Sequence, residues 1–158
     1  MKKSVIAVLS AVGGAVLASI GVGKNLNEKL KYQNNMSNKH LSLYLMMNQW
    51  VNVKQENKSI TEYLEKNGYR EIAIYGMNYV GETLVKELEN SNVKIKYGVD
   101  QNAENIYMDV DILKPDDDLP QVDAIIVTAI TFFEGIAESL SQKVDCPILS
   151  MEDILYEV

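Results

Sequence analysis

The sequence contains little of the chemistry that depends on cysteine or histidine. Cys146 is the only cysteine and His40 the only histidine among 158 residues. A single cysteine excludes an internal disulfide bond. One cysteine and one histidine are also too few ligands for a Cys/His zinc site. A Ser-His-Asp or Cys-His triad is also disfavoured, because His40 is expected to be an exposed residue near the start of a helix. We expect no metal site, and the sequence offers no catalytic residue.

Positive charge is scarce in the second part of the chain. Residues 1–58 carry eight lysines and two glutamates, a net charge of +6, whereas residues 59–158 carry seven basic and twenty acidic residues, a net charge of −13. Because binding to phosphate backbones needs a basic surface, the acidic part argues against DNA or RNA as a partner. The lysines after residue 23 fit either anionic lipid headgroups or an ordinary solvated helix face.

Charge is absent altogether from Ser4 to Gly23, a run of 20 residues. A helix rising about 1.5 Å per residue would span the hydrocarbon core of a membrane over this run, so we expect a transmembrane anchor in residues 1–23. Small residues recur at every fourth position, which would let another transmembrane helix approach and form a homo-oligomer; plain helix-forming composition is the alternative. This ridge consists of Ala7, Ala11, Ala15, Ser19 and Gly23.

A secretory signal peptide is the other interpretation of this segment, with cleavage after Ala18. The uncharged run is longer than a usual signal core and lacks a clean Ala-x-Ala site, so we favour an uncleaved anchor. More lysines follow the run than precede it, which by the positive-inside rule places the C-terminal side in the cytoplasm. We therefore expect a single-pass protein of the cell membrane with a cytoplasmic C-terminal domain.

Residues 24–58 are expected to be a helical stalk followed by a docking helix. Residues 24–37 are polar and basic, and Asn38 is in a position to cap a second helix. One face of that helix would carry Leu43, Met46, Met47 and Trp50. This face either packs on the domain that follows, which we favour, or binds a partner or the membrane surface.

Strand and helix patterns alternate over residues 59–158. Apolar runs predict strands at 71–76, 122–129 and 146–150, and alternation of apolar and polar residues predicts one at 93–100. Three capping boxes, Ser59/Glu62, Thr131/Glu134 and Ser150/Asp153, predict helix starts. Such alternation is typical of an α/β domain, so we predict a Rossmann-like, three-layer parallel sheet of about four to five strands. The segment after residue 100 is too short for a helical crossover, so we expect an irregular region with a short edge strand at 106–110.

Glycines flank the end of the first predicted strand and the start of the next helix in "IAIYGMNYVGETLVKEL" (72–88). In a Gly-x-Gly-x-x-Gly dinucleotide finger, the first glycine makes the turn, the second admits the pyrophosphate and the third lets helix and strand pack. Gly76 and Gly81 fill the first and third places, and Asn78 stands at the second. Asparagine tolerates left-handed backbone geometry, and its amide can donate to a phosphate, but its side chain occupies space that a phosphate would use.

An acidic residue follows at the expected distance. Asp100 lies 24 residues after Gly76 at the end of the second predicted strand, where the acid of a dinucleotide fold accepts ribose hydroxyls. Polar residues are also common at the tip of any such strand. Nucleotide binding and use of the fold as a bare scaffold therefore both remain open.

The segments "IAIYGMNYVGETLVKELE", "YGVDQN" and "VDAIIVTAI" resemble the small NAD(P)-binding-like Rossmann domains of bacterial surface-polysaccharide loci, often described as nucleoside-diphosphate-sugar epimerase-like. The resemblance covers residues 59–158. It implies NAD(P) or a nucleotide-sugar as the ligand. The implied contacts are a phosphate loop, a ribose contact and a crevice loop, formed by Gly76, Met77, Asn78, Tyr79, Gly81, Asp100, Thr128 and Thr131. The chain departs from the catalytic members because it has no Tyr-x-x-x-Lys pair and shows no substrate-binding domain after the fold.

Two functions of different classes fit these observations. The first is a membrane-anchored, Rossmann-like module that binds a nucleotide, dinucleotide or nucleotide-sugar in cell-envelope polysaccharide biosynthesis, beside a membrane-bound or transferase partner. The second is a non-catalytic interaction or scaffold module with a vestigial nucleotide site, which docks a membrane enzyme. In either case, any catalysis would need a partner to supply the acid and the base.

Overall fold

The computed structural model describes the backbone of residues 2–158 and the side chains of residues 28–158. Contacts divide the chain into two compact units, residues 1–41 and 42–158. Helix α1 (Lys2–Gln55) supplies the first unit and the beginning of the second. The predicted membrane span and its small-residue ridge lie outside the residues whose side chains are described. Within residues 28–158, no helix has an apolar stretch long enough to cross a membrane.

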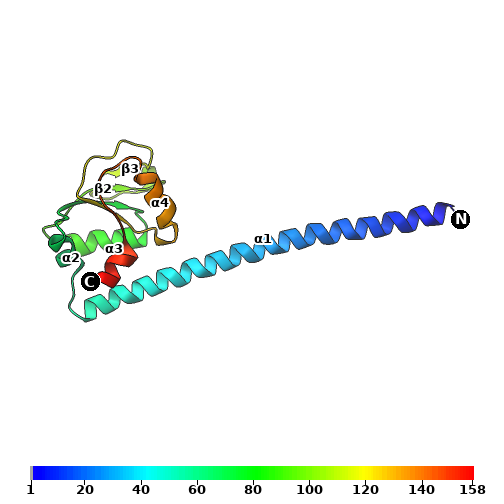
Figure 1. The fold of residues 1–158 in the computed structure, drawn as a ribbon, viewed down its shortest axis with the longest axis horizontal. Helices are drawn as coiled ribbons and strands as arrows, with labels where there is room; N and C mark the ends of the chain where they lie inside the picture. Colours follow the sequence, from blue (N-terminus) through cyan, green and yellow to red (C-terminus); the bar gives the residue numbers. More distant parts are fainter. Residues whose placement is uncertain (1) are drawn as a thin grey trace. The chain divides into compact units, whose positions relative to one another are not determined.

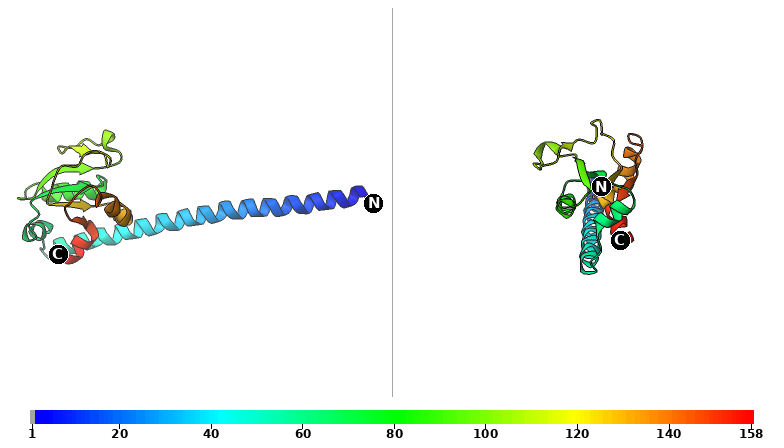
Figure 2. Two further views of the ribbon diagram at one scale, coloured as in Figure 1. Left: turned by 45° about the horizontal axis from the view of Figure 1, so that its top comes forward. Right: turned by 90° about the vertical axis from the view of Figure 1, so that its left-hand side faces the viewer.

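A five-stranded parallel sheet forms the centre of the second unit (Figure 1, Figure 2). Its order is β3-β2-β1-β4-β5, so the direction of winding reverses between β1 and β4. The strands are β1 (Glu71–Tyr75), β2 (Lys94–Val99), β3 (Ile112–Leu113), β4 (Ala124–Val127) and β5 (Ile148–Ser150). The prediction of an α/β, Rossmann-like parallel sheet is confirmed. In such sheets, ligands bind outside the carboxyl ends of the strands at the point of reversal.

Buried apolar residues form two clusters on opposite faces of the sheet. Strand β1 shows the alternation, because Ile72 and Ile74 belong to one cluster and Ala73 to the other. The first face is covered by α1, α2 (Ile60–Lys66), α3 (Tyr79–Leu88) and α5 (Met151–Glu157), and the second by α4 (Phe133–Leu140) (Figure 1). The domain therefore has three layers, with its helices divided unevenly between the two faces.

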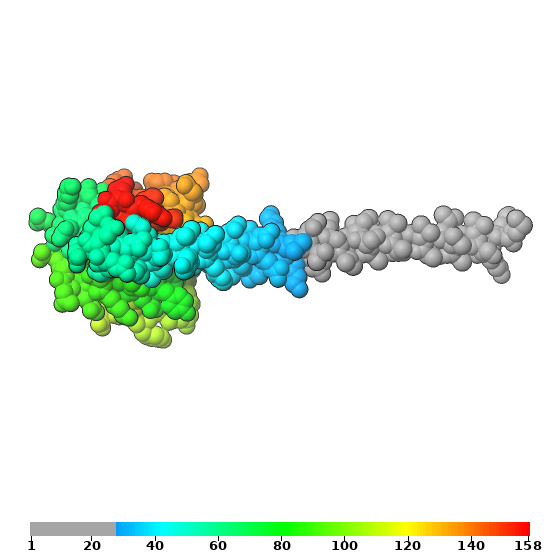
Figure 3. Space-filling model, turned by 90° about the horizontal axis from the view of Figure 1, so that it is seen from below, coloured from blue at the N-terminus to red at the C-terminus, as the bar shows by residue number. Residues whose placement is uncertain are grey.

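The end of α1 is part of the domain core. Met46, Trp50 and Val53 are 0%, 4% and 2% exposed, and Gln49 Nε2 donates to the Leu155 carbonyl in α5 at 3.0 Å. Figure 3 shows the α1 residues of this unit at the surface beside α5. The interpretation of a core-packing helix is confirmed.

Two details of this helix were predicted wrongly. Met47 is 37% exposed. The buried face of the helix is formed by Met46, Trp50 and Val53, which follow one another at helical spacing, and Met47 lies beside that face. Asn38 does not start a helix, because α1 continues through it without a break. Its side chain is therefore not needed to cap orphan backbone groups.

The predicted helix starts are confirmed in part. The Ser59 hydroxyl accepts the Glu62 N–H at the start of α2, and Gly68, with a φ of +81°, follows its end. Thr131 does not cap α4, because the chain first makes a 3-10 turn, η2 (Ile130–Phe132), which buries Ile130 directly after β4. Ser150 does precede α5, but it makes no capping hydrogen bond with its side chain.

The connection from β2 to β3 contains only a 3-10 turn, η1 (Ala103–Asn105). The irregular region is confirmed, but the edge strand predicted at 106–110 is wrong. Strand β3 pairs only with the end of β2, Gly98 with Ile112 and Val99 with Leu113. Residues 106–110 connect the turn η1 to the start of β3 at Ile112, so they do not pair with β2.

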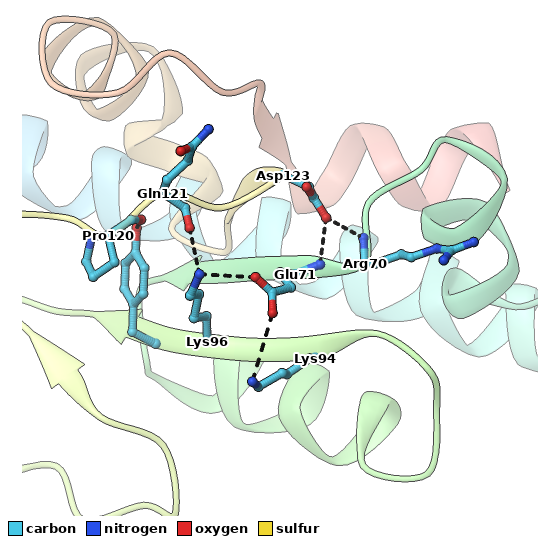
Figure 4. Close-up of polar contacts among 8 residues, drawn as sticks. Arg70, Glu71, Lys94, Lys96, Pro120, Gln121 and Asp123 are labelled. Carbon is cyan, nitrogen blue, oxygen red and sulfur yellow. Dashed lines mark hydrogen bonds and ion pairs between the residues drawn. The ribbon is translucent and has the colours of Figure 1, made fainter.

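A polar network joins the strands at the amino-terminal edge of the sheet (Figure 4). Asp123 Oδ2 accepts the N–H groups of Glu71 at 2.7 Å and Arg70 at 2.8 Å. These two bonds hold the pKa of the Asp123 carboxyl below its usual range. Lys96 donates to both Glu71 and the Gln121 carbonyl. This edge is opposite the ligand-binding edge of such sheets, so we interpret the network as structural.

Candidate functional site

The finger turn at the end of β1 needs both of its glycines. Gly76 has a φ of +97°, and a Cβ atom there would lie 2.7 Å from Thr128 Oγ1. Its N–H donates to the Val99 carbonyl at 2.8 Å. A Cβ atom on Gly81 would overlap the Gly76 carbonyl oxygen. The first glycine therefore makes the turn and the third lets α3 approach β1, as in a dinucleotide finger.

Asn78 acts as the N-cap of α3. Its φ of −84° is not left-handed, and its Oδ1 accepts the Val80 N–H at 3.1 Å. A helix N-terminus binds anions through backbone N–H groups such as this one. The carboxamide oxygen therefore takes the place of an anion oxygen at Val80, and donation from the Asn78 amide nitrogen to a phosphate stays a prediction.

Asp100 reaches the finger loop, as predicted, but it binds the protein. Its Oδ2 accepts the Met77 N–H at 2.8 Å, and its Oδ1 accepts the Asn102 N–H at 2.8 Å. The pairing of Tyr75 with Val99 brings the two strand ends together and so places Asp100 beside this loop. Through these two hydrogen bonds, the carboxylate links the finger loop to the turn after β2.

The other predicted contacts are divided between the core and the surface. Met77 is 3% exposed, and its side chain packs where a Cβ atom on Gly98 would lie. Thr128 is fully buried at the winding reversal, where its hydroxyl is within hydrogen-bond distance of the Tyr75 and Gly76 carbonyls. Tyr79 is 86% exposed.

Thr131 lies apart from the finger. It lines a cavity of about 580 Å³ together with Ser150 and residues of α4 and α5. The structure therefore brings together Gly76, Met77, Asn78, Asp100 and Thr128 and leaves Tyr79 and Thr131 outside.

Sequence reasoning missed the phenol beside this loop. Burial raises the pKa of Tyr75, a hydrogen bond with Gln101 opposes the rise, and the charge of Asp100 adds to it. Its position directly before the first glycine was the available signal. The Lys114 ammonium, for its part, bonds Glu104 at 2.5 Å.

The cavities of the described part of the chain do not lie at the finger loop. Four of them, between about 450 and 590 Å³, include none of Gly76, Asn78 and Asp100 in their linings. The one of about 590 Å³ lies between α3 and the irregular β2–β3 connection. Within the part of the chain whose side chains are described, no group of three or more acidic, cysteine or histidine residues is placed to hold a metal ion.

Comparisons with protein-family models, with curated proteins and with solved structures found no match to this chain. The geometry of the finger and its surroundings is therefore the basis for the proposal that follows.

Proposed function

We propose that this chain is a membrane-anchored, non-catalytic interaction module whose Rossmann-like domain carries a vestigial nucleotide site. The observation that carries the proposal is the closed finger: Asn78 takes the Val80 N–H and Asp100 takes the Met77 N–H. The membrane anchor rests on the uncharged run of residues 4–23. The partner, a membrane enzyme of envelope-polysaccharide synthesis such as a transferase, rests on the resemblance described above.

A nucleotide would have to displace these side chains before it could bind. Each displaced hydrogen bond costs about 1 kcal/mol net, and more where a charged group is left unpaired. The buried Thr128 hydroxyl donates to the Gly76 carbonyl at the winding reversal, which ties β4 to the finger turn. The backbone N–H groups of the loop are thus already bound by side chains of the protein. This favours a structural role for the finger over a ligand-binding role.

A surface for a protein partner lies where a crossover helix would cover the sheet. The connection between β2 and β3 supplies no helix, so Val85, Ile95 and Met108 are only partly buried. Val85, Ile95 and Met108 line the cavity of about 590 Å³, and Tyr107 beside them is 91% exposed. A helix of the partner would take the place of the absent crossover helix. The lining of the cavity also carries charges of both signs, from Lys86, Lys94, Glu89 and Asp109.

The closed finger is tested by thermal unfolding of the full chain with candidate ligands. Trp50 is the only tryptophan and is buried in the domain core, so its fluorescence reports unfolding of this unit. The panel contains NAD, NADP, coenzyme A, and UDP- and CDP-sugars. A ligand at 100 times its dissociation constant would add about 2.7 kcal/mol to the free energy of unfolding. We expect no shift, and a saturable shift with any member would overturn the proposal.

The partner surface is tested by site-specific photo-crosslinking in cells. A photoreactive tyrosine analogue is placed at Tyr107 or, as the control, at Tyr156, which is 62% exposed on α5. We expect one discrete adduct from position 107 that is lost when Val85→Glu is added, and none from position 156. Equal labelling from both positions, or an adduct indifferent to Val85→Glu, would contradict a partner at this cavity.

Nucleotide binding is the second candidate, and one observation favours it. Asp100 lies against the finger at the carboxyl edge of the sheet, and each carboxylate oxygen retains a lone pair after its bond to Met77 or Asn102. This candidate predicts that Asn78→Gly, which removes the capping side chain, preserves or raises affinity for a member of the panel. An Asn78→Gly protein that gives no shift would leave the closed-finger proposal standing alone.

A further inference from the structure

The face of α1 turned away from the domain carries exposed apolar side chains. Tyr44, Leu45 and Val51 are 66%, 46% and 50% exposed, whereas Met46 and Trp50 on the other face are buried. Farther towards the N-terminus, Leu30 and Leu41 are 47% and 55% exposed. Side chains of this size left in water along one helix indicate an unfilled interface.

These residues follow a heptad repeat. Because α1 is continuous, one register applies throughout, with Leu41 and Asn48 at a positions and Leu30, Tyr44 and Val51 at d positions. Of the seven large apolar residues exposed on the described part of α1, only Tyr32 lies outside the a, d, e and g positions. Residues 30–51 contain seven a and d positions, of which Leu30, Leu41, Tyr44 and Val51 are apolar and Asn34, Ser37 and Asn48 are polar.

Residues 28–41 are the part of the first unit whose side chains are described. Every residue from Glu28 to Asn35 is exposed. A helix that is polar and exposed all round is marginal in water unless a partner covers one of its sides. A second helix along the heptad seam would supply that cover.

We propose that two copies of this chain associate through α1 as a parallel, in-register coiled coil over residues 30–51. The occupant is a second copy because of what stands at the a positions, where Asn34 and Asn48 are two heptads apart and both exposed. In a parallel, in-register pair, each asparagine faces its own copy, so the amides donate to and accept from each other. An unrelated apolar helix would leave them facing apolar groups, and an antiparallel pairing would not place each asparagine opposite its own copy.

Charge also permits two identical helices to meet. No a or d position from Leu30 to Val51 carries a charged residue. The g-position Lys54 is bound by Glu87 of its own domain at 2.6 Å. Two copies of this basic helix can therefore pair without placing like charges in the seam.

Cysteine crosslinking of the full chain tests this arrangement. In a Cys146→Ser background, Asn34→Cys places a thiol in the seam, and Asn35→Cys is the matched control because it changes the same exposed residue type one position away. Under mild oxidation of unfractionated cell lysate, we expect at least tenfold more disulfide-linked dimer from position 34 than from position 35. Asn48→Cys should behave like Asn34→Cys.

A second change separates this seam from other causes of dimerisation. Adding Tyr44→Glu to Asn34→Cys should abolish the crosslink, and an unchanged melting temperature would show that the domain remains folded. Equal crosslinking at positions 34 and 35, or a crosslink that survives Tyr44→Glu, would overturn the proposal. The first result would exclude this register, and the second would show that the copies are held together elsewhere.

Discussion

Replacing Asp100 by alanine should destabilise the domain even though no ligand is present. The carboxylate accepts two backbone N–H groups, from Met77 and Asn102, each at 2.8 Å. Hydrogen bonds to a charged group contribute about 1.5 kcal/mol each at the lower end of their range. Asp100 is partly exposed, and solvent screening reduces that sum, so we expect a loss of about 2 kcal/mol. For a domain of this size, the melting temperature should fall by about 8 °C.

The assay is thermal and urea unfolding of the full chain in detergent, followed by Trp50 fluorescence. Asp118→Ala is the matched control, because Asp118 is an exposed acid for which the structure shows no hydrogen bond or ion pair. It removes the same charge and should change the free energy of unfolding by less than about 0.5 kcal/mol. An Asp100→Ala protein as stable as the Asp118→Ala protein would refute the idea that this carboxylate serves the loop, and it would favour a role in ligand binding.

Substitutions at four further positions follow from the structure. Asn78→Ala should cost about 1 kcal/mol through loss of the α3 cap, and Asn78→Gly only a few tenths, both measured by urea unfolding. Gly76→Ala should cost about 3 kcal/mol or more, because a φ of +97° and the contact with the Thr128 hydroxyl both oppose a Cβ atom; wild-type stability would contradict the turn described here. Trp50→Ala should cost about 3–5 kcal/mol, checked by circular dichroism because the fluorophore is lost. Burial raises the pKa of Tyr97 from 10.0 to about 12, so the stability it contributes is present below pH 10 and is lost as the pH rises towards 12; urea midpoints should fall less over that window in Tyr97→Phe than in wild type.

Strands β1 and β4 could be predicted because their residues are largely buried on both faces of the sheet and therefore appear as continuous apolar runs. Residues 72–74 of β1 and residues 124–127 of β4 contain no polar side chain. The edge strand was misplaced because it has only two residues, and its position depends on where β2 ends rather than on its own sequence. Likewise, the capping box at Thr131 was locally plausible, but burial of Ile130 determined the turn.

The contacts of the finger residues could not be derived from the sequence. The spacing of Gly76, Asn78 and Asp100 is equally compatible with a bound nucleotide and with a loop closed on itself. Only the register of β1 against β2 places the Asp100 carboxylate on the Met77 N–H. The cap at Val80 likewise depends on the rotamer of Asn78, which sequence spacing does not specify.

The two faces of α1 make its length as important as its composition. Met46, Trp50 and Val53 must meet the sheet, while the heptad seam must face the opposite way. Inserting or deleting one residue between Leu41 and Met46 would shift the helical phase of the residues before it by about 100° against Met46, Trp50 and Val53. The helix could then keep its core contacts or a continuous seam, but not both. We therefore expect variants of this chain to tolerate many substitutions along α1, and a length change of seven residues there better than a change of one or two.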